Sequence, residues 1–244
     1  MERKSILNIP FVNTTQQGFI EQLMTDHNQN TKRFIITANP EIVMQARHNP
    51  EIMSYLQQAD YVTPDGIGVV IGGKLLNKPL TERITGYDTM IGLLEKANDH
   101  HLSIYLLGAA KETLPLTIEN IHKDYPNITI AGSHHGFFDW ESPAIINEIK
   151  ATRPDFIFVA LGVPRQEKWI TMHLPAVDHG IFMGVGGSFD VIAGTVKRAP
   201  VIWQKLYLEW LYRLLKQPSR FGRMLSLPKF ALTVLKVRLT GKEQ

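Results

Sequence analysis

The chain has no cysteine among its 244 residues, which excludes disulfide bonds, thiolate metal sites and a cysteine nucleophile. It also has no uninterrupted apolar run approaching the roughly 20 residues that a membrane-spanning helix needs. The charged residues Glu2, Arg3 and Lys4 are not followed by the apolar segment of a signal peptide. We therefore expect a cytoplasmic protein without a transmembrane segment.

Three common signatures of phosphate chemistry are missing as well. No G-x-G-x-x-G follows the first strand and no Walker A sequence occurs, so neither a standard NAD site nor a P-loop is expected. There is no D-x-D pair, which would hold a divalent cation against a diphosphate. The nearest substitute, Asp139-Trp140-Glu141, stands directly before Ser142-Pro143 and is better explained as an acidic entry to a helix. We expect no metal and no other cofactor.

The net charge of +3 conceals an uneven distribution. Residues 197–244 carry eleven Lys and Arg and two acidic residues, which gives +9, whereas the preceding residues carry fifteen bases and twenty-one acids, which gives −6. A basic tail on an acidic body predicts an anionic partner for the tail, which could be nucleic acid, phospholipid or a phosphorylated substrate.

Strand-like apolar runs alternate with helical patterns along the chain, and 44% apolar residues suffice for a sizeable core. We expect strands at 6–12, 34–36, 61–62, 104–107, 128–131, 156–161 and 181–185, and helices at about 15–25, 50–58, 86–99, 111–123, 143–151 and 164–173. This alternation predicts an α/β fold with a mostly parallel sheet and helices on both faces. The one candidate boundary, Ala199-Pro200, predicts an α/β body over 1–198 and a helical C-terminal appendage over 199–244.

Two strands end in short polar turns before a helix. The first leads into Thr37-Ala38-Asn39-Pro40-Glu41 and the second into Thr63-Pro64-Asp65-Gly66. Open α/β sheets bind ligands at such strand ends, and a carboxylate beside hydrogen-bonding groups can act as a general base for a hydroxyl nucleophile. Each motif alone can also be an ordinary turn.

Further strands end in glycine-rich turns that we expect on the same edge of the sheet. These turns contain Gly108, Gly136 and Phe137, the segment Gly162 to Lys168, and the segment Gly184 to Asp190 with Gly186 and Gly187. Glycine lets backbone N–H groups approach a phosphate, although tight packing of a strand on a helix also needs it. Together the turns favour a nucleotide site.

The segment Val201 to Lys216 confines its charges to Lys205, Glu209, Arg213 and Lys216, a spacing that predicts one helix with a wide apolar surface and one polar stripe. Such a helix can pack in a core or a dimer interface. Aromatic and leucine side chains beside Lys and Arg are also typical of a segment that lies on an anionic membrane surface.

The chain resembles the WecG/TagA/CpsF glycosyltransferase family in an ordered set of segments that spans nearly its whole length: 37–41, 64–66, 83–86, 107–109, 135–136, 162–167 and 184–190. The likeness is closest to the enzymes of the teichoic-acid linkage unit. It implies a Rossmann-like body and a C-terminal appendage that closes over the site and touches the inner face of the cell membrane. The implied reaction moves N-acetylmannosamine, with inversion, from UDP-N-acetylmannosamine to undecaprenyl-diphosphate-linked N-acetylglucosamine.

The resemblance also implies roles for individual residues. It assigns the general base to Asp65, polar pocket residues to Thr37, Asn39 and Gln166, and contact with the donor diphosphate to Arg83. We also expect Gly108, Gly136, Phe137, Lys168, Gly186, Gly187 and Asp190 to bind substrate, and the family's appendage arginines correspond to Arg213, Arg220 and Arg223. Arginines would then neutralise the diphosphate in place of a metal.

Several alternatives stay open. Arg83 could pair with Glu82 or Asp88, and His134 and His135 could be acid–base groups or structural hydrogen-bonding residues. Another UDP-hexose could be the donor, or the protein could bind a UDP-sugar without catalysis. A nucleic-acid-binding protein is disfavoured because no reader motif appears. Oligomerisation is possible, and the sequence leaves the oligomeric state open.

Overall fold

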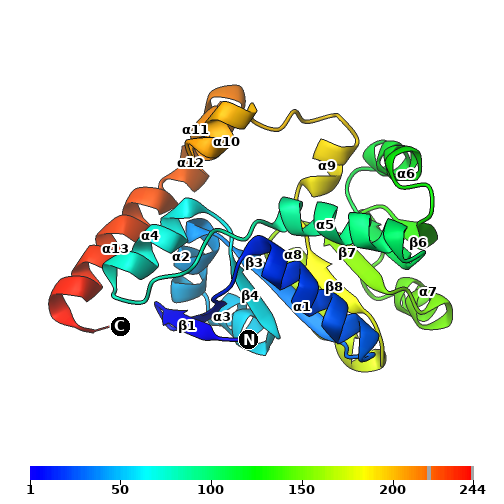
Figure 1. Cartoon of the computed structure of the whole chain (residues 1–244), viewed down its shortest axis with the longest axis horizontal. Helices are drawn as coiled ribbons and strands as arrows, with labels where there is room; N and C mark the ends of the chain where they lie inside the picture. The colour runs from blue at the N-terminus through cyan, green and yellow to red at the C-terminus, as the bar shows by residue number, and fades with distance from the viewer. Residues whose placement is uncertain (219–220, 243–244) are drawn as a thin grey trace.

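The computed structural model describes residues 1–218 and 221–242, except for the side chain of Arg213. Its eight strands form one sheet in the order β1-β2-β4-β3-β8-β7-β5-β6, in which every pairing is parallel except β1 with β2. The strands are β1 (Arg3–Ile6), β2 (Ile9–Val12), β3 (Arg33–Ala38), β4 (Tyr61–Pro64), β5 (Ser103–Gly108), β6 (Thr129–His134), β7 (Phe156–Ala160) and β8 (Ile181–Gly184). The α/β fold expected from the alternating pattern is confirmed (Figure 1).

Helices cover both faces of this sheet. They are α1 (Gln16–Asn28), α2 (Pro40–His48), α3 (Pro50–Gln58), α4 (Ile67–Leu75), α5 (Gly86–Asp99), α6 (Thr113–Asp124), α7 (Ala144–Thr152), α8 (Arg165–His173), the 3₁₀ turn η1 (Leu174–Ala176), α9 (Ser188–Ile192), α10 (Val201–Lys205), α11 (Glu209–Lys216), α12 (Phe221–Met224) and α13 (Ser226–Thr240). Side chains alternate along each strand, so in β3 Phe34 and Ile36 join the core under α2, α3, α7 and α8. Ile35 joins the core under α1, α5 and α6.

The first expected strand, 6–12, is wrong, because the structure has a tight antiparallel hairpin there. Ile6 of β1 pairs with Ile9 of β2, and the two residues between them, Leu7 and Asn8, have φ values of 50° and 66°. Two successive positive φ values are typical of the two-residue turns that match the twist of a hairpin. Leu7 is fully buried and continues the apolar pattern, so the sequence carried little sign of the turn.

The single helix expected over 201–216 is also wrong, because α10 and α11 are separated at Tyr207. The backbone of Tyr207 is left-handed, with φ of 59°, and the N–H of Leu208 returns to the carbonyl of Trp203 at 2.8 Å. Such a hydrogen bond satisfies a carbonyl at the end of a helix. The break turns the chain, so α11 is not a continuation of α10.

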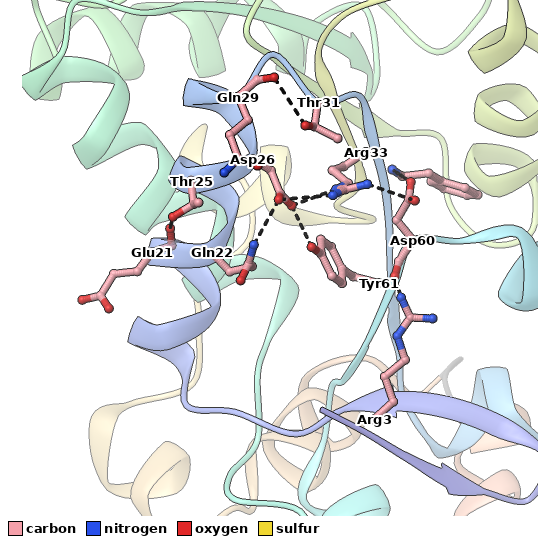
Figure 2. A network of polar contacts seen from close by, with 11 residues as sticks. Arg3, Glu21, Gln22, Thr25, Asp26, Gln29, Thr31, Arg33, Asp60 and Tyr61 are labelled. Carbon is pink, nitrogen blue, oxygen red and sulfur yellow. Dashed lines mark hydrogen bonds and ion pairs between the residues drawn. The ribbon is translucent and has the colours of Figure 1, made fainter. Parts of the chain in front are cut away.

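A polar network ties α1, β3, β4 and β1 together at the amino ends of the strands (Figure 2). The carboxylate of Asp26, 1% exposed, accepts hydrogen bonds from Arg33 at 2.8 Å and from the hydroxyl of Tyr61 at 2.7 Å. Burial raises the pKa of Asp26, but these hydrogen bonds outweigh it and hold the pKa below its ordinary value. Arg3 donates to the carbonyl oxygen of Asp60 at 2.8 Å, which anchors the edge hairpin. The polar turns lie at the opposite side of the sheet, at the carboxyl ends of the parallel strands.

The C-terminal helix α13 lies against α2 and α4 (Figure 1). Its side chains Phe230, Val234 and Val237 are buried in the same core as β3 and α3. A Cβ atom on Gly72 of α4 would come within 2.9 Å of the Phe230 ring, so the missing side chain at Gly72 allows this close contact. No helix in the described ranges is both long enough and apolar enough to cross a bilayer.

Candidate functional site

A cavity of about 950 Å³ lies at the carboxyl ends of β3, β4, β7 and β8, with residues of α4 and the C-terminal helices completing its wall. Nine of the residues expected at the site line it: Thr37, Asn39, Asp65, Arg83, Gln166, Gly186, Gly187, Asp190 and Arg223. Apart from Arg223 of α12, these residues lie at the end of a strand or in the connection that follows it, and the parallel strands bring these ends to one edge of the sheet.

The turns after β3 and β4 are neighbours because Ala38 pairs with Pro64 across these strands. The side-chain carbonyl of Asn39 accepts a hydrogen bond from the N–H of Ile42 at 3.0 Å and so caps α2. The N–H of Asp65 donates to the carbonyl of Ala38 at 3.1 Å, which holds the second turn against the first.

The carboxylate of Asp65 points toward the start of α5. Its Oδ2 accepts a hydrogen bond from the N–H of Gly86 at 3.4 Å. The side chain of Thr37 packs against the same residue, since a Cβ atom on Gly86 would lie 3.0 Å from Thr37 Oγ1. Asp65, Thr37 and the helix start therefore share one corner of the cavity, where the helix dipole favours a negative charge.

Arg83 reaches from this corner toward the C-terminal helices. Its Nη1 lies 3.9 Å from Oε2 of Glu209 in α11, and its guanidinium carbon lies 5.8 Å from the ring centroid of Tyr207. Of the two partners considered from the sequence, Glu82 accepts a hydrogen bond from the backbone of Gln16, and Asp88 forms an ion pair with another arginine. The contact with Glu209 makes Arg83 a link between the body and α11.

That other arginine is Arg198, which the sequence did not indicate. Its Nη1 lies 2.8 Å from Oδ1 of Asp88, and its guanidinium carbon lies 4.5 Å from the ring centroid of Tyr87. Burial raises the pKa of Asp88, but hydrogen bonds from Arg198 and Thr85 outweigh it and leave the pKa below its ordinary value. Arg198 therefore fastens the connection after α9 to the start of α5, beside Arg83.

Gln166 stands at the start of α8 and is 3% exposed. Its Oε1 accepts a hydrogen bond from the N–H of Gly186 at 3.1 Å, and its Nε2 donates to Oε1 of Glu167 at 2.9 Å. A Cβ atom on Gly184 would lie 2.5 Å from that Nε2, so this position needs a glycine to admit the amide. Burial raises the pKa of Glu167 to about 7. This residue is not among those expected at the site from the sequence.

Of the three arginines expected in the appendage, the structure describes the side chain of Arg223 only. Arg223 of α12 lines the cavity, and its Nε lies 2.8 Å from Oε1 of Glu41 at the start of α2. Arg213 belongs to α11, but its side chain lies outside the described part of the structure, as does the whole of Arg220.

Four expected substrate-binding residues lie away from the cavity lining. The backbone turns of Gly108 and Gly136 meet at Ala109, whose carbonyl accepts the Gly136 N–H at 2.8 Å. Phe137 is 72% exposed, and Lys168 forms an ion pair with Glu51 at 3.7 Å. The strand order separates the first two from the site, since β5 and β6 stand at the far end of the sheet.

The two histidines lie at the end of β6 and directly after it, and are not among the lining residues of the cavity. Nδ1 of His134 is 2.8 Å from the carbonyl oxygen of His135, and Nδ1 of His135 accepts a hydrogen bond from the N–H of Phe137 at 3.2 Å. Oδ1 of Asp139 accepts from the N–H of Glu141 at 3.0 Å. Among the residues described, no group of three or more His, Asp or Glu side chains is arranged to hold a metal ion.

The cavity therefore combines carboxylates, guanidinium groups and amides at one sheet edge. A carboxylate can accept the proton of an attacking hydroxyl, and guanidinium groups can stabilise negative charge on a departing phosphate. This chemistry suits the displacement of a phosphorylated leaving group.

Comparison with known proteins agrees with this chemistry. The model of the "Glycosyl transferase WecG/TagA/CpsF family" matches residues 4–244. A Bacillus spizizenii protein named N-acetylglucosaminyldiphosphoundecaprenol N-acetyl-beta-D-mannosaminyltransferase is 44% identical over 237 residues, which cover 97% of this chain and 92% of the relative. A Staphylococcus aureus protein of the same name is 41% identical over 235 residues, with 96% and 92% coverage.

Proposed function

The chain belongs to the WecG/TagA/CpsF family of glycosyl transferases, and from this premise we propose that it transfers N-acetylmannosamine from UDP-N-acetylmannosamine to undecaprenyl-diphosphate-linked N-acetylglucosamine. The acceptor and the transferred sugar are those in the names of its relatives. The reaction would supply the linkage unit of wall teichoic acid. The observation that carries the proposal is the cavity in which Asp65, Thr37, Arg83 and Gln166 meet.

In this mechanism Asp65 is the general base. The acceptor hydroxyl oxygen attacks the anomeric carbon of the donor, its proton passes to the Asp65 carboxylate, and the bond from that carbon to the UDP oxygen breaks with its electron pair leaving on UDP. One displacement inverts the anomeric centre, so an α-linked donor gives a β-linked product. The N–H of Gly86, 3.4 Å from Oδ2, orients the carboxylate in this corner of the cavity.

The departing diphosphate needs cationic partners. Arg83 and Arg223 line the cavity and are paired with Glu209 and Glu41 respectively. Guanidinium groups bind phosphate oxygens through paired hydrogen bonds, so the diphosphate can exchange for these carboxylates when the donor enters. Arg213 and Arg220, whose side chains lie outside the described part of the structure, would add to this charge.

The same C-terminal region, residues 199–244, would act as an appendage on the 1–198 body and bring the enzyme to its lipid-linked acceptor at the inner membrane surface. Exposed apolar side chains are spread over its helices, among them Val201, Ile202, Leu206, Leu215, Phe221, Leu232 and Leu239. They share this region with the +9 charge of residues 197–244. Apolar side chains among Lys and Arg favour attachment to an anionic bilayer surface.

Product analysis tests the proposal directly. The protein is incubated with UDP-N-acetylmannosamine and a lipid-diphosphate N-acetylglucosamine analogue, and we expect a β-linked disaccharide and free UDP. If the protein consumed a different UDP-hexose instead, that sugar nucleotide would be the donor. If it bound a UDP-sugar without turnover, it would be a binding protein and not an enzyme.

The Asp65→Asn variant tests the base. Turnover should fall by roughly 10²–10⁴, as expected for the loss of acid–base catalysis, while UDP affinity stays near normal. Asp139→Asn, in a turn away from the cavity lining, is the matched control and should keep full turnover. Near-normal turnover of Asp65→Asn would remove this residue from the mechanism.

A further inference from the structure

We propose that Glu167 is a positioning residue for the transfer: it holds the carboxamide of Gln166 in one orientation, and through it fixes the glycine turn after β8 that lines the cavity. The functional part of this inference rests on the proposed function, in which the cavity receives the UDP-sugar. Glu167 itself is not part of the cavity lining, whereas Gln166, Gly186 and Gly187 are.

The hydrogen bonds define the orientation of the amide. The Gln166 carbonyl faces the N–H of Gly186 at 3.1 Å, and its NH₂ group faces Oε1 of Glu167 at 2.9 Å. A flipped amide would set its NH₂ group against the N–H of Gly186 and its carbonyl against the carboxyl oxygen. The NH₂ group and the N–H are both donors, and the carbonyl and the carboxyl oxygen are both acceptors, so neither pair could form a hydrogen bond. Protonating Glu167 would relieve only the second of these conflicts. Glu167 therefore selects which end of the amide reaches Gly186.

Because both side chains are buried, the orientation of the Gln166 amide is set by protein groups and not by water. Gln166 and Glu167 are each 3% exposed, so bulk water is not at hand to replace either partner. The second carboxyl oxygen of Glu167, Oε2, is buried and has no hydrogen-bond partner within the described structure. A buried carboxyl with one oxygen unsatisfied costs stability. An apolar side chain at this position would avoid that cost, but it could not accept the hydrogen bond from Gln166.

The glycine turn depends on this contact for its shape. Gly186 has a left-handed backbone with φ of 53°, and its N–H donates to Gln166. The preceding residue, Val185, is held by a hydrogen bond to the carbonyl of Val159 at 2.9 Å, so the turn is fastened at two successive residues. Loss of the Gln166 contact would leave Gly186 and Gly187 without their tie to α8, at the place where they border the cavity.

Two substitutions of similar size separate positioning from packing. Glu167→Met fills the space without an acceptor, whereas Glu167→Gln keeps one carbonyl oxygen for the Gln166 amide. We expect Glu167→Met to raise KM for the UDP-sugar about tenfold, in line with the loss of a buried hydrogen bond, and to change kcat less. Glu167→Gln should stay within about twofold of the parent in both constants. If the Met variant does not fold, Glu167→Ala removes the same acceptor.

A double-substitution cycle shows whether Glu167 acts through Gln166. If it does, Gln166→Met raises KM on its own, and adding Glu167→Met to it brings no further rise. Equal and additive effects, or a Glu167→Gln variant as impaired as Glu167→Met, would overturn the proposal. So would a folded Glu167→Met variant with normal KM.

Amide hydrogen exchange at Gly186 gives a readout independent of turnover. Exchange of this N–H should accelerate about tenfold in Glu167→Met and in Gln166→Met, and remain as in the parent in Glu167→Gln, when all three are compared at equal global stability. Unchanged exchange in Glu167→Met refutes the positioning role. If the three variants show this exchange pattern but the parent transfers no sugar, the proposed function is refuted and the structural role of Glu167 remains supported.

Discussion

Truncating Phe230 to alanine should destabilise the whole α/β fold, although this residue belongs to the last helix of the chain. Phe230 is 3% exposed, and its ring lies against Gly72 of α4. It shares the larger of the two cores with residues of β3, α2 and α3. Removing a buried phenylalanine ring typically costs about 3–5 kcal/mol of unfolding free energy, and Gly72, against which the ring lies, has no side chain to refill the space.

The magnitude can be measured by urea unfolding followed by circular dichroism and by tryptophan fluorescence. For a chain of this size, about 3–5 kcal/mol corresponds to a fall of roughly 10 °C in the melting midpoint. Leu239→Ala on the same helix is the matched control, because Leu239 is 85% exposed and should change the unfolding free energy by less than about 0.5 kcal/mol. A Phe230→Ala variant as stable as Leu239→Ala would refute the reasoning.

The packing of α13 also determines how stable the chain would be without residues 199–244. The division predicted from the sequence, a body over 1–198 and an appendage over 199–244, implies that the body would stay folded after this deletion. In the structure the deletion would uncover the apolar surface of α2 and α4 that Phe230 and Val234 now cover. We therefore expect the truncated body to be markedly less stable, so the loss of transfer in such a variant would not by itself identify an active-site role.

Three further predictions concern metal, pH and membrane. Transfer should survive excess EDTA, because arginines can neutralise the diphosphate; complete loss restored by Mg²⁺ would contradict this. Burial raises the pKa of Glu167 from 4.5 to about 7, so its contribution to stability is full below pH 4.5 and is lost as the pH rises through 7. Glu167→Gln should escape that loss, gaining about 3 kcal/mol in unfolding free energy relative to the parent between pH 4 and 8; parallel pH curves for the two proteins would exclude it. Replacing Lys229, Lys236 and Arg238 by Gln should weaken binding to anionic vesicles by up to about 3 kcal/mol. The same change at Lys111, Lys123 and Lys150, which lie in α6, in α7 or just before α6, should have little effect in sedimentation assays, because α6 and α7 lie at the opposite end of the molecule from α13 (Figure 1).

The central strands could be predicted from sequence because a parallel strand buried on both faces is an unbroken apolar run. Phe156 to Ala160 and Ile181 to Gly184 are of this kind, and both strands are found close to their expected limits. The break at Tyr207 could not be predicted, because a positive φ at an aromatic residue is set by tertiary packing and leaves no local signal. At the hairpin only Asn8 is a usual turn residue, and the apolar Leu7 beside it concealed the turn.

The candidate site could be predicted in part for a similar reason. Strand ends were visible in the sequence, so residues such as Asp65 and Gln166 could be assigned to one edge of the sheet. The lateral order of the strands was not visible, and this order decides which ends are neighbours. It sets β5 and β6 apart from β3 and β4, which is why Gly108 and Gly136 lie away from the cavity lining while the turns of β7 and β8 contribute to it.

The contact between Gly184 and Gln166 has a consequence for how this family can diverge. A Cβ atom at 184 would stand 2.5 Å from Nε2 of Gln166 and 3.0 Å from Cδ, so the two positions form a coupled pair in evolution. Alanine at 184 would force the Gln166 amide out of its present position, so homologues that keep the hydrogen bonds of this amide should keep the glycine. Covariation of these two columns, 18 positions apart in the numbering used here, would record the constraint across the family.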